Sequence, residues 1–252
     1  MVDCLGIIPA RYASARFPGK ALSMINGKSM IRRVYERCAA SDVLRKILVA
    51  TDDQRIFDHV KSFGGSVMMT SPHHRSGTER CAEVCGRLRS EANMALPDII
   101  INIQGDEPYI HPDQISLVAS CFDHPDTNIA TLARIIRDPE ELNSPHTVKV
   151  VMDLRHRALL FSRSVIPFQR GRQTDQWHIA FPYLKHIGIY AYRAGTLMEL
   201  VTLPPTLLET SESLEQLRWM EHGHDIYVSL TQHDSYAVDV PDDLEKLPKH
   251  LP

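Results

Sequence analysis

Three cations follow an apolar segment near the start of the chain. The run Leu5 to Ile8 has the composition of a buried strand, and the loop after it carries Arg11, Arg16 and Lys20 among small residues. Small residues let a backbone approach phosphate closely, and fixed cations neutralise the phosphate charge. A first strand that leads into such a loop is typical of nucleotide sites in α/β proteins, although this loop lacks the glycine spacing of a Walker A motif. The loop therefore predicts a phosphate-binding site, and the alternative is a basic loop that faces solvent.

Two carboxylates occupy positions where a hard cation could bind. Asp106 lies in the turn Gln104-Gly105-Asp106-Glu107-Pro108, directly after the apolar run 98–103, and we expect Asp239 to lie at the end of another strand. Ligands of α/β proteins bind beyond the carboxyl ends of parallel strands. Mg²⁺ favours one or two carboxylates together with phosphate oxygens. The pair predicts a magnesium site, and the alternative is that these acidic turns only cap helices.

Further polar side chains could recognise a base and an acceptor. Ser76 and Thr78 lie at the start of a predicted helix, where a hydroxyl could bond a base edge or simply cap the helix. Arg163 follows a strand-like run, and its guanidinium would match the carboxylate of an anionic acceptor. Glu215 and Gln216 lie on a predicted helix beside apolar residues. A structural role is the alternative for each of these residues.

The elements that must position these residues alternate along the first half of the chain. Apolar residues recur at helical spacing in three segments, and apolar or β-branched runs separate them. The predicted helices include 30–38, 56–63 and 81–88, and the predicted strands are 5–8, 46–51, 66–70 and 98–104. Fully apolar strands that alternate with amphipathic helices imply a parallel sheet that is covered on both faces.

The second half of the chain is less regular. Strands are predicted over 128–136, 148–152, 158–161, 186–192 and 226–230, and helices begin near Pro112 and cover 214–221. Polar residues and prolines fill 163–183, which we interpret as a long functional loop. No linker rich in Gly, Ser or Pro divides the sequence, so we expect one α/β domain with an inserted subregion.

Composition excludes several classes of protein. The 252 residues carry a net charge of −3, with 43% hydrophobic and 23% charged residues, so there is no general basic field to attract nucleic acid. No apolar run approaches the length of a membrane span, and the N-terminus lacks the pattern of a signal peptide. We therefore expect a cytoplasmic protein without nucleic-acid or membrane partners.

Cysteine and histidine positions do not predict a structural metal. The five cysteines form no Cys-x-x-Cys pair, which indicates reduced thiols, and Cys81 and Cys85 are expected to pack in the core. The densest histidine clusters are His73-His74 and His222-Gly-His224. Neither has acidic or thiol partners at ligand spacing, so a structural zinc site is not expected.

The ordered motifs resemble those of the 3-deoxy-manno-octulosonate (Kdo) cytidylyltransferase family, also called CMP-Kdo synthetases. The resemblance covers residues 8 to 247. It rests on Ile-Pro-Ala-Arg-Tyr-Ala-Ser, Pro-Gly-Lys, Ala-Thr-Asp, Ser-Gly-Thr-Glu-Arg, Gln-Gly-Asp-Glu-Pro, Phe-Ser-Arg, His-Ile-Gly-Ile-Tyr, Leu-Glu-Gln-Leu-Arg and Val-Asp. Several of these motifs also occur in the wider group of sugar nucleotidyltransferases. The chain departs from the family pattern at Ala15, Phe17 and Ala21, which affects the flexibility of the first loop and not the chemistry.

The resemblance implies a fold, a reaction and roles for the residues. The fold would be the three-layer nucleotide-diphospho-sugar transferase fold, a single domain over 1–252 with a mixed, mostly parallel sheet and a sugar-binding and dimerisation subregion at about 140–220. The reaction would be CTP plus Kdo giving CMP-Kdo and pyrophosphate, a step that supplies a precursor of bacterial lipopolysaccharide. Mg²⁺ would be the cofactor, and the enzyme would be a homodimer. The residues implied are Lys20, Asp106 and Asp239 for catalysis, Asp106 and Asp239 for Mg²⁺, Arg11, Ser14, Arg16, Lys20, Ser76, Thr78, Arg80 and Gln104 for the nucleotide, and Arg163, His186, Tyr190, Glu215 and Gln216 for the sugar.

Two other functions remain open at the level of sequence. One is a cytidylyltransferase that acts on another acid sugar, such as 8-amino-Kdo or sialic acid. The other is a non-catalytic regulator that binds nucleotides on the same fold. Lys20, Asp106 and Asp239 are all intact, which argues against a regulator, because a degenerate member of the family could lose them freely.

Overall fold

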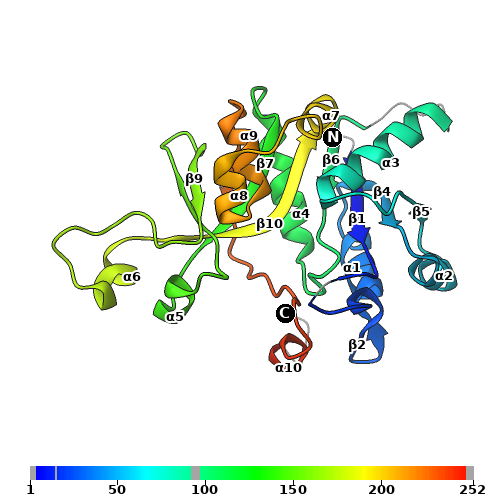
Figure 1. The fold of residues 1–252 in the computed structure, drawn as a ribbon, viewed down its shortest axis with the longest axis horizontal. Coiled ribbons are helices and arrows are strands. Elements are labelled where there is room, and N and C mark those ends of the chain that lie inside the picture. Colours follow the sequence, from blue (N-terminus) through cyan, green and yellow to red (C-terminus); the bar gives the residue numbers. More distant parts are fainter. Residues whose placement is uncertain (1–3, 15, 92–96, 248–252) are drawn as a thin grey trace.

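The structure, a computed structural model, describes residues 4–14, 16–91 and 97–247, in which a large mixed sheet carries helices on both faces (Figure 1). The strands are β1 (Cys4–Ala10), β2 (Met24–Ile25), β3 (Lys28–Ser29), β4 (Leu44–Thr51), β5 (Val67–Met69), β6 (Ile99–Asn102), β7 (Ile129–Ile135), β8 (Lys149–Met152), β9 (Ala158–Ser162), β10 (Leu184–Arg193) and β11 (Tyr227–Leu230). The α-helices are α1 (Met30–Ala39), α2 (Gln54–Ser62), α3 (Gly77–Glu91), α4 (Pro112–Ser120), α5 (Pro139–Asn143), α6 (Trp177–Ala180), α7 (Ala194–Leu200), α8 (Leu207–Glu212), α9 (Glu215–Glu221) and α10 (Asp243–Lys246). Short 3₁₀ turns lie at Lys20–Leu22, Cys121–Asp123 and Thr174–Gln176.

The nine-stranded sheet is mostly parallel. Its order is β11-β7-β10-β6-β1-β4-β5, and β8 and β9 continue from β10. β1 is parallel to β4 and β6, β4 to β5, and β11 to β7, whereas β10 is antiparallel to β6, β7 and β8. Seven of the nine strands of this sheet therefore run in one direction, and β9 and β10 run in the opposite direction. The expectation of a mixed, mostly parallel sheet is confirmed.

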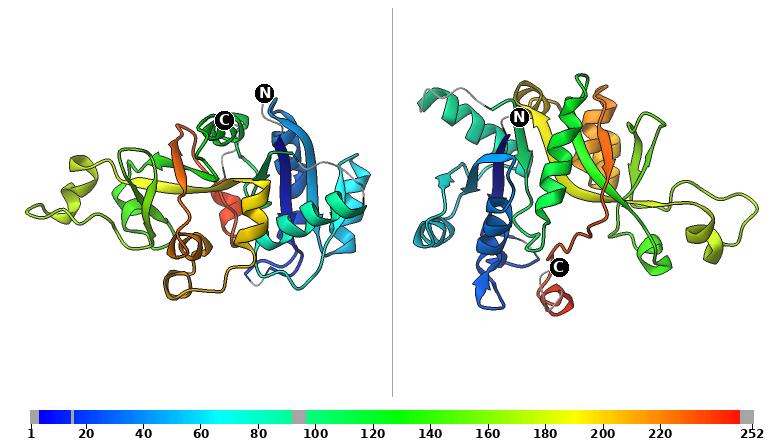
Figure 2. Two further views of the ribbon diagram at one scale, coloured as in Figure 1. Left: turned by 90° about the horizontal axis from the view of Figure 1, so that it is seen from above. Right: turned by 180° about the vertical axis from the view of Figure 1, so that it is seen from behind.

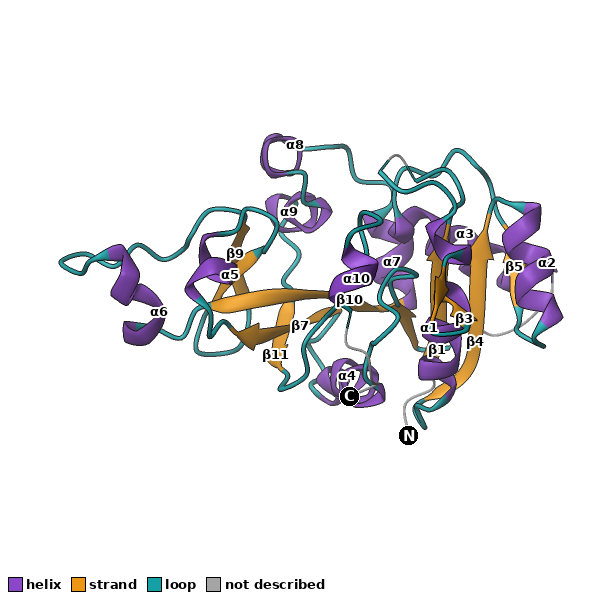
Figure 3. Cartoon of the chain, turned by 90° about the horizontal axis from the view of Figure 1, so that it is seen from below, coloured by secondary structure: helices purple, strands orange, loops and turns teal. Residues whose placement is uncertain are grey.

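Helices bury apolar stripes against each face of the sheet. One face packs against α3, α7 and α9 through side chains that include Cys81, Cys85 and Trp219. The other face packs against α1, α2 and α4 through side chains that include Val34 and Ile115. Figure 3 shows α8 and α9 on the opposite side of the sheet from α4. All five cysteines are buried and free, as expected for core residues.

Most of the predicted elements are present, and three details differ from the sequence analysis. Asp239 does not end a strand; it lies in an extended segment after β11 that pairs with no strand. The long loop 163–183 contains the short helix α6 and projects beyond the sheet (Figure 2). The structure also adds the short β2–β3 hairpin and helices α5, α7, α8 and α10, which are too short for a clear period. Among the described residues, no helix is long and apolar enough to cross a membrane.

Candidate active site

Two carboxylates and two cations meet at the carboxyl edge of the sheet. The Nζ atom of Lys20 donates to the carboxylate of Asp106 and lies 3.8 Å from Oδ1 of Asp239. The same Oδ1 atom accepts from Nη2 of Arg16 at 2.8 Å. Asp106 and Asp239 are 133 positions apart (239 − 106). The fold therefore brings the two candidate metal ligands to one ammonium group.

Close backbone packing builds this edge. A Cβ atom on Gly105 would lie 2.6 Å from the carbonyl oxygen of Pro9, so the turn after β6 can approach the end of β1 only because residue 105 is glycine. The backbone N–H of Val238 donates to the carbonyl oxygen of Asp106 at 3.0 Å. That hydrogen bond holds the segment that carries Asp239 against the turn that carries Asp106.

The first loop folds back over the same edge. Gly19 has a φ angle of +73°, a left-handed conformation that favours glycine, and its N–H donates to the carbonyl oxygen of Tyr12 at 2.8 Å. This closure directs Lys20 toward the carboxylates. Ala15 lies outside the described residues, so its departure from the family pattern has no structural account.

A cavity of about 280 Å³ opens beside these charges. Its lining comes from the ends of β1 and β6, the first loop and the start of α3, and it includes most of the residues that were expected to bind the nucleotide. These are Arg11, Ser14, Arg16, Lys20, Ser76, Arg80 and Gln104, whereas Thr78 does not line it. The two expected metal ligands, Asp106 and Asp239, also line this cavity. Cationic side chains beside two carboxylates suit a triphosphate that is bound with a divalent cation.

The donor set fits Mg²⁺. Both carboxylates already face positively charged nitrogens, which take the place that a divalent cation would have between them. The side chains of Arg16 and Asp239 are 61% and 46% exposed to solvent. Replacing Arg16 by a metal ion as the partner of Asp239 therefore costs little free energy. Two carboxylates with phosphate oxygens are the ligands that Mg²⁺ prefers.

The start of α3 joins the nucleotide cavity to one of the residues that were expected to bind the sugar. Ser76 Oγ accepts from the N–H of Glu79 at 3.2 Å, so it caps the helix, and it also donates to Oε1 of Glu215 at 2.8 Å. Thr78 Oγ1 donates to Oε2 of Glu215 at 2.7 Å. Burial raises the pKa of Glu215, against the effect of these hydrogen bonds and of Arg218. Both hydroxyls therefore face Glu215 in this structure.

Arg80 is held by a partner that the sequence analysis did not assign. Its Nη2 atom donates to Oδ2 of Asp52 at 3.0 Å, and the arginine side chain is only 4% exposed. Asp52 follows β4 in the Ala-Thr-Asp motif, so its position after a strand was the signal that could have revealed it. This pair fixes Arg80, which lines the first cavity.

A bulge in β10 brings two expected sugar-binding residues together. His186 pairs with Ala133 of β7, but Tyr190 pairs with Thr131, so four positions on β10 span only two on β7. The rings of His186 and Tyr190 therefore lie on one face, with centroids 5.3 Å apart.

His186 is held as a neutral imidazole. The hydroxyl of Thr131 donates to the carbonyl oxygen of Ile189 (2.8 Å) and lies 3.0 Å from Nε2 of His186, which places the imidazole proton on Nε2. Burial lowers the pKa of His186 to about 3. The ring can therefore donate or accept hydrogen bonds but carries no charge at neutral pH.

A second cavity of about 590 Å³ adjoins the first and shares Arg16 and Asp239 with it. His186, Lys185 and Glu107 also line it. The sequence analysis assigned no role to Lys185 or Glu107. Lys185 precedes His186 and Glu107 follows Asp106, and both of those neighbours had been assigned to the site.

Glu107 is a buried acid in this second cavity. Ser235 Oγ donates to its Oε1 atom at 2.7 Å, and burial raises its pKa to about 7. Its carboxyl group is therefore partly protonated near neutral pH, unlike an ordinary surface carboxylate.

Arg163 lines neither cavity. Its Nε atom donates to the carbonyl oxygen of Glu212 at 2.8 Å, and its Nη1 atom donates to that of Pro145 at 3.0 Å. The buried Lys149 ammonium in turn donates to the carbonyl oxygen of Arg163. These contacts brace the start of the 163–183 loop.

Gln216 is buried on α9, beside Glu215.

Comparison with known proteins gives a consistent result. The family profile described as cytidylyltransferase matches residues 5–226. The chain is 49% identical to the 3-deoxy-manno-octulosonate cytidylyltransferase of Parabacteroides distasonis, over 98% of this chain and 97% of the relative. It is 47% identical to the protein of the same name from Geobacter sulfurreducens, over 99% of this chain and 100% of the relative.

Solved structures agree with these sequence matches. The structure of CMP:2-keto-3-deoxy-manno-octonic acid synthetase complexed with CTP matches with a TM-score of 0.87 at 42% identity, over 97% of this chain and 96% of that one. The 4-diphosphocytidyl-2C-methyl-D-erythritol synthase of Anaerococcus prevotii matches with a TM-score of 0.60 at 11% identity, over 97% of this chain and 96% of that one. This match shows that the two proteins share a fold.

Proposed function

Because the chain belongs to the cytidylyltransferase family, and within it to the 3-deoxy-manno-octulosonate cytidylyltransferases, we propose that it transfers CMP from CTP to Kdo. The products are CMP-Kdo and pyrophosphate, and the product sugar nucleotide serves lipopolysaccharide biosynthesis. The observation that carries this proposal is the convergence of Arg16, Lys20, Asp106 and Asp239 on one cavity.

The residues of this chain position CTP and Kdo for the reaction and neutralise the negative charge of the triphosphate. The anomeric hydroxyl oxygen of Kdo forms a bond to the α-phosphorus. The bond from that phosphorus to the bridging oxygen of the β-phosphate breaks, pyrophosphate leaves, and the hydroxyl proton passes to water. Arg11, Arg16 and Lys20 bind the triphosphate oxygens and hold the leaving group in line. Lys20 exchanges its contact with Asp106 for phosphate when CTP binds.

Mg²⁺ is the proposed cofactor, with Asp106 and Asp239 as its protein ligands. When bound, Mg²⁺ would supply positive charge that offsets the charge of the α-phosphate and favours loss of the proton from the anomeric hydroxyl. In the structure Lys20 contacts both carboxylates, so nucleotide binding must release this ammonium group before both can serve as ligands.

The nucleotide and the sugar occupy neighbouring cavities in this proposal. Ser14 binds the nucleotide, and Ser76, Thr78, Arg80 and Gln104 hold the cytosine and ribose. His186 lines the second cavity and holds the sugar there. Tyr190, Glu215 and Gln216 line neither cavity and complete the proposed sugar-binding set, with Arg163 as the candidate for the sugar's carboxylate. The shared wall at Arg16 and Asp239 supports this arrangement, because the two reacting groups must meet there.

Assembly and location are further parts of the proposal. We propose a cytoplasmic homodimer in which a subregion at about 140–220 contributes to sugar binding and to the subunit contact. The free, buried cysteines are consistent with a reducing compartment. The 163–183 segment projects from the sheet and exposes Phe168 and Ile179, at 73% and 80%, which a subunit contact would cover (Figure 1).

Pyrophosphate release tests the reaction and its rivals. The purified chain is assayed with Mg²⁺, with each of four nucleoside triphosphates, and with Kdo, 8-amino-Kdo or sialic acid as acceptor. We expect release only with CTP, and the highest kcat/KM with Kdo. A higher kcat/KM for another acid sugar would replace Kdo as the substrate. CTP binding without turnover on any acceptor would instead identify a nucleotide-binding regulator.

A further inference from the structure

Asp239 is the more exposed of the two proposed magnesium ligands. Its side chain is 46% exposed to solvent, against 24% for Asp106, and it contacts Arg16 and Lys20. Both cations are proposed to bind the triphosphate, so neither can hold the carboxylate in place once CTP is bound. Within the described residues, the extended segment that carries Asp239 pairs with no strand. The position of this carboxylate must therefore come from contacts of the backbone around it.

One side chain holds the backbone on both sides of Asp239. The Oδ2 atom of Asp243 accepts from the N–H of Asp239 at 2.9 Å and from the N–H of Val240 at 3.0 Å. These two N–H groups belong to the peptide planes before and after the Cα atom of Asp239. Because each peptide unit is planar, holding both planes restricts φ and ψ at Asp239 and thereby the direction of its side chain.

Two backbone hydrogen bonds complete this arrangement. The N–H of Asp243 donates to the carbonyl oxygen of Val240 at 3.1 Å, and the N–H of Val238 donates to that of Asp106 at 3.0 Å. The N–H groups of residues 238 to 240 are therefore all held, the first by Asp106 itself and the other two by Asp243. The two bonds to Asp243 are charge-assisted, which makes them stronger than bonds to a neutral acceptor.

From this geometry we propose that Asp243 is a positioning residue, which holds the backbone at Asp239 so that the carboxylates of Asp239 and Asp106 reach one Mg²⁺ ion. This inference rests on the proposed function, which assigns these two carboxylates to the metal. Contacts that orient a metal ligand typically change metal affinity by about 10- to 100-fold. Asp243 acts through its oxygen acceptor and not through its negative charge, and this distinction can be measured.

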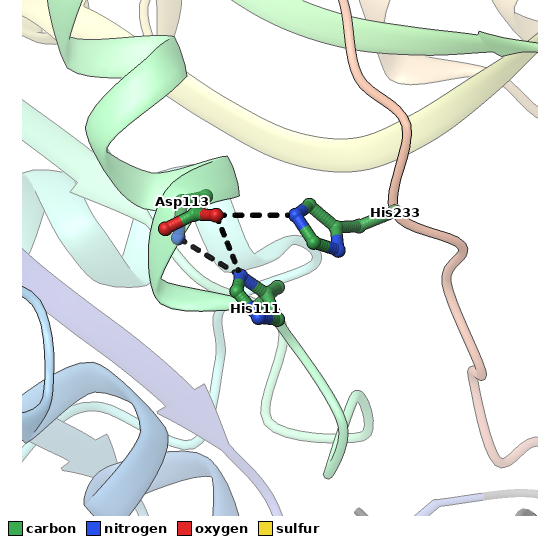
Figure 4. Close-up of side chains that lie close together, drawn as sticks. All are labelled: His111, Asp113 and His233. Carbon is green, nitrogen blue, oxygen red and sulfur yellow. Dashed lines mark hydrogen bonds and ion pairs between the residues drawn. The ribbon is translucent and has the colours of Figure 1, made fainter. Parts of the chain in front are cut away.

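A second anchor of the same segment provides a comparison (Figure 4). His233 precedes Asp239 by six positions (239 − 233). Its ring stacks on that of His111, with centroids 3.7 Å apart, and its Nε2 atom donates to Oδ2 of Asp113 at 3.2 Å. This anchor attaches the segment to the start of α4, whereas the Asp243 contacts lie at Asp239 itself. Loss of the His233 anchor should therefore loosen the segment without changing the direction of the Asp239 side chain.

Calorimetry of CTP binding in the absence of Kdo tests the proposal without turnover. The Kd for CTP is measured on the full chain in a chelator and again in excess Mg²⁺, and the ratio of the two values reports how much the metal contributes. We expect Mg²⁺ to tighten CTP binding to the wild type by more than about tenfold. Asp243→Ala should reduce this gain by about tenfold and leave the Kd in chelator nearly unchanged.

Two further changes at the same position separate geometry from charge. Asp243→Asn keeps an oxygen that can accept both N–H groups but removes the charge, so it should retain the gain from Mg²⁺. Asp243→Glu keeps the charge but moves the oxygen by one methylene, so it should lose part of the gain. It also provides a second measurement if Asp243→Ala does not fold.

Two controls test whether the effect is specific to Asp243. Asp242→Ala removes a neighbouring carboxylate that, within the described residues, makes no capping hydrogen bond to α10, and it should retain the gain. His233→Gln removes the stacked ring and should also retain it. A full gain in both Asp243→Ala and Asp243→Glu, or an equal loss in Asp243→Asn or in either control, would overturn the positioning role. A wild type that gains nothing from Mg²⁺ would instead overturn the assignment of the metal to Asp106 and Asp239, and this proposal with it.

Discussion

The carboxylates of Asp106 and Asp239 both contact the ammonium group of Lys20, although they belong to segments 133 positions apart (239 − 106). The N–H of Val238 donates to the carbonyl oxygen of Asp106, so the backbone fixes this convergence as well as the side chains do. A pair of carboxylates held by a removable cation is suited to receive a metal ion when phosphate attracts the lysine away.

Removal of one of these carboxylates should reduce turnover strongly. Asp106→Asn keeps the size of the side chain but removes its negative charge, so we expect kcat to fall by about a hundredfold or more. This corresponds to roughly 3 kcal/mol of transition-state stabilisation. Steady-state pyrophosphate release at saturating CTP and Kdo measures the effect. Asp126→Asn, an exposed change outside both cavities, serves as the control and should retain full turnover.

Lys20 should act on the nucleotide and not on the sugar. Lys20→Ala removes a cation from the wall of the first cavity, so binding of CTP should weaken strongly while the affinity for Kdo stays nearly unchanged. Calorimetry with each substrate alone separates the two effects. Lys61→Ala, an exposed lysine of α2, should alter neither affinity. An equal loss for both substrates would contradict the assignment of Lys20 to the triphosphate.

Arg163 tests how the acceptor carboxylate is recognised. If the guanidinium leaves its contacts with Pro145 and Glu212 to bind Kdo, Arg163→Ala should raise the KM for Kdo by about tenfold to a hundredfold, the loss of a charged hydrogen bond of about 1.5–3 kcal/mol. The KM for CTP should barely change. A lower Tm with unchanged Kdo kinetics would leave Arg163 only its bracing role and would favour His186 and Gln216 as sugar ligands.

Glu107 should make the protein less stable as pH rises. Its pKa is raised from 4.5 to about 7 by burial, so between these values the native state binds more protons than the unfolded state. The contribution of Glu107 to the free energy of unfolding is therefore most favourable below pH 4.5 and is lost as pH rises to about 7, by up to about 3 kcal/mol.

Chemical denaturation at pH 5 and pH 8 measures this linkage. Glu107→Gln cannot ionise, so its stability relative to the wild type should increase from pH 5 to pH 8. The exposed change Glu221→Gln should show no such trend. A relative stability of Glu107→Gln that stays constant or decreases over this interval would contradict a raised pKa for Glu107.

Local sequence determined the elements and the chemistry that they carry. The apolar runs before Arg11 and Gln104 predicted strands followed by polar turns, and the structure places β1 and β6 there. This inference works because burial on both faces of a parallel sheet requires a continuous apolar strand, and because the backbone must turn where that strand ends. The order of the motifs was also sufficient to identify the family.

The tertiary structure alone decided which distant residues meet. Strand order brings Glu215 of α9 to the hydroxyls of Ser76 and Thr78, and it brings His233 to His111 and Asp113 across 120 residues (233 − 113). The bulge in β10 sets the spacing of its aromatic rings through its register with β7. Such contacts depend on sheet order and register, which arise from packing of the whole chain, whereas hydrophobic periodicity reports only whether a segment is buried.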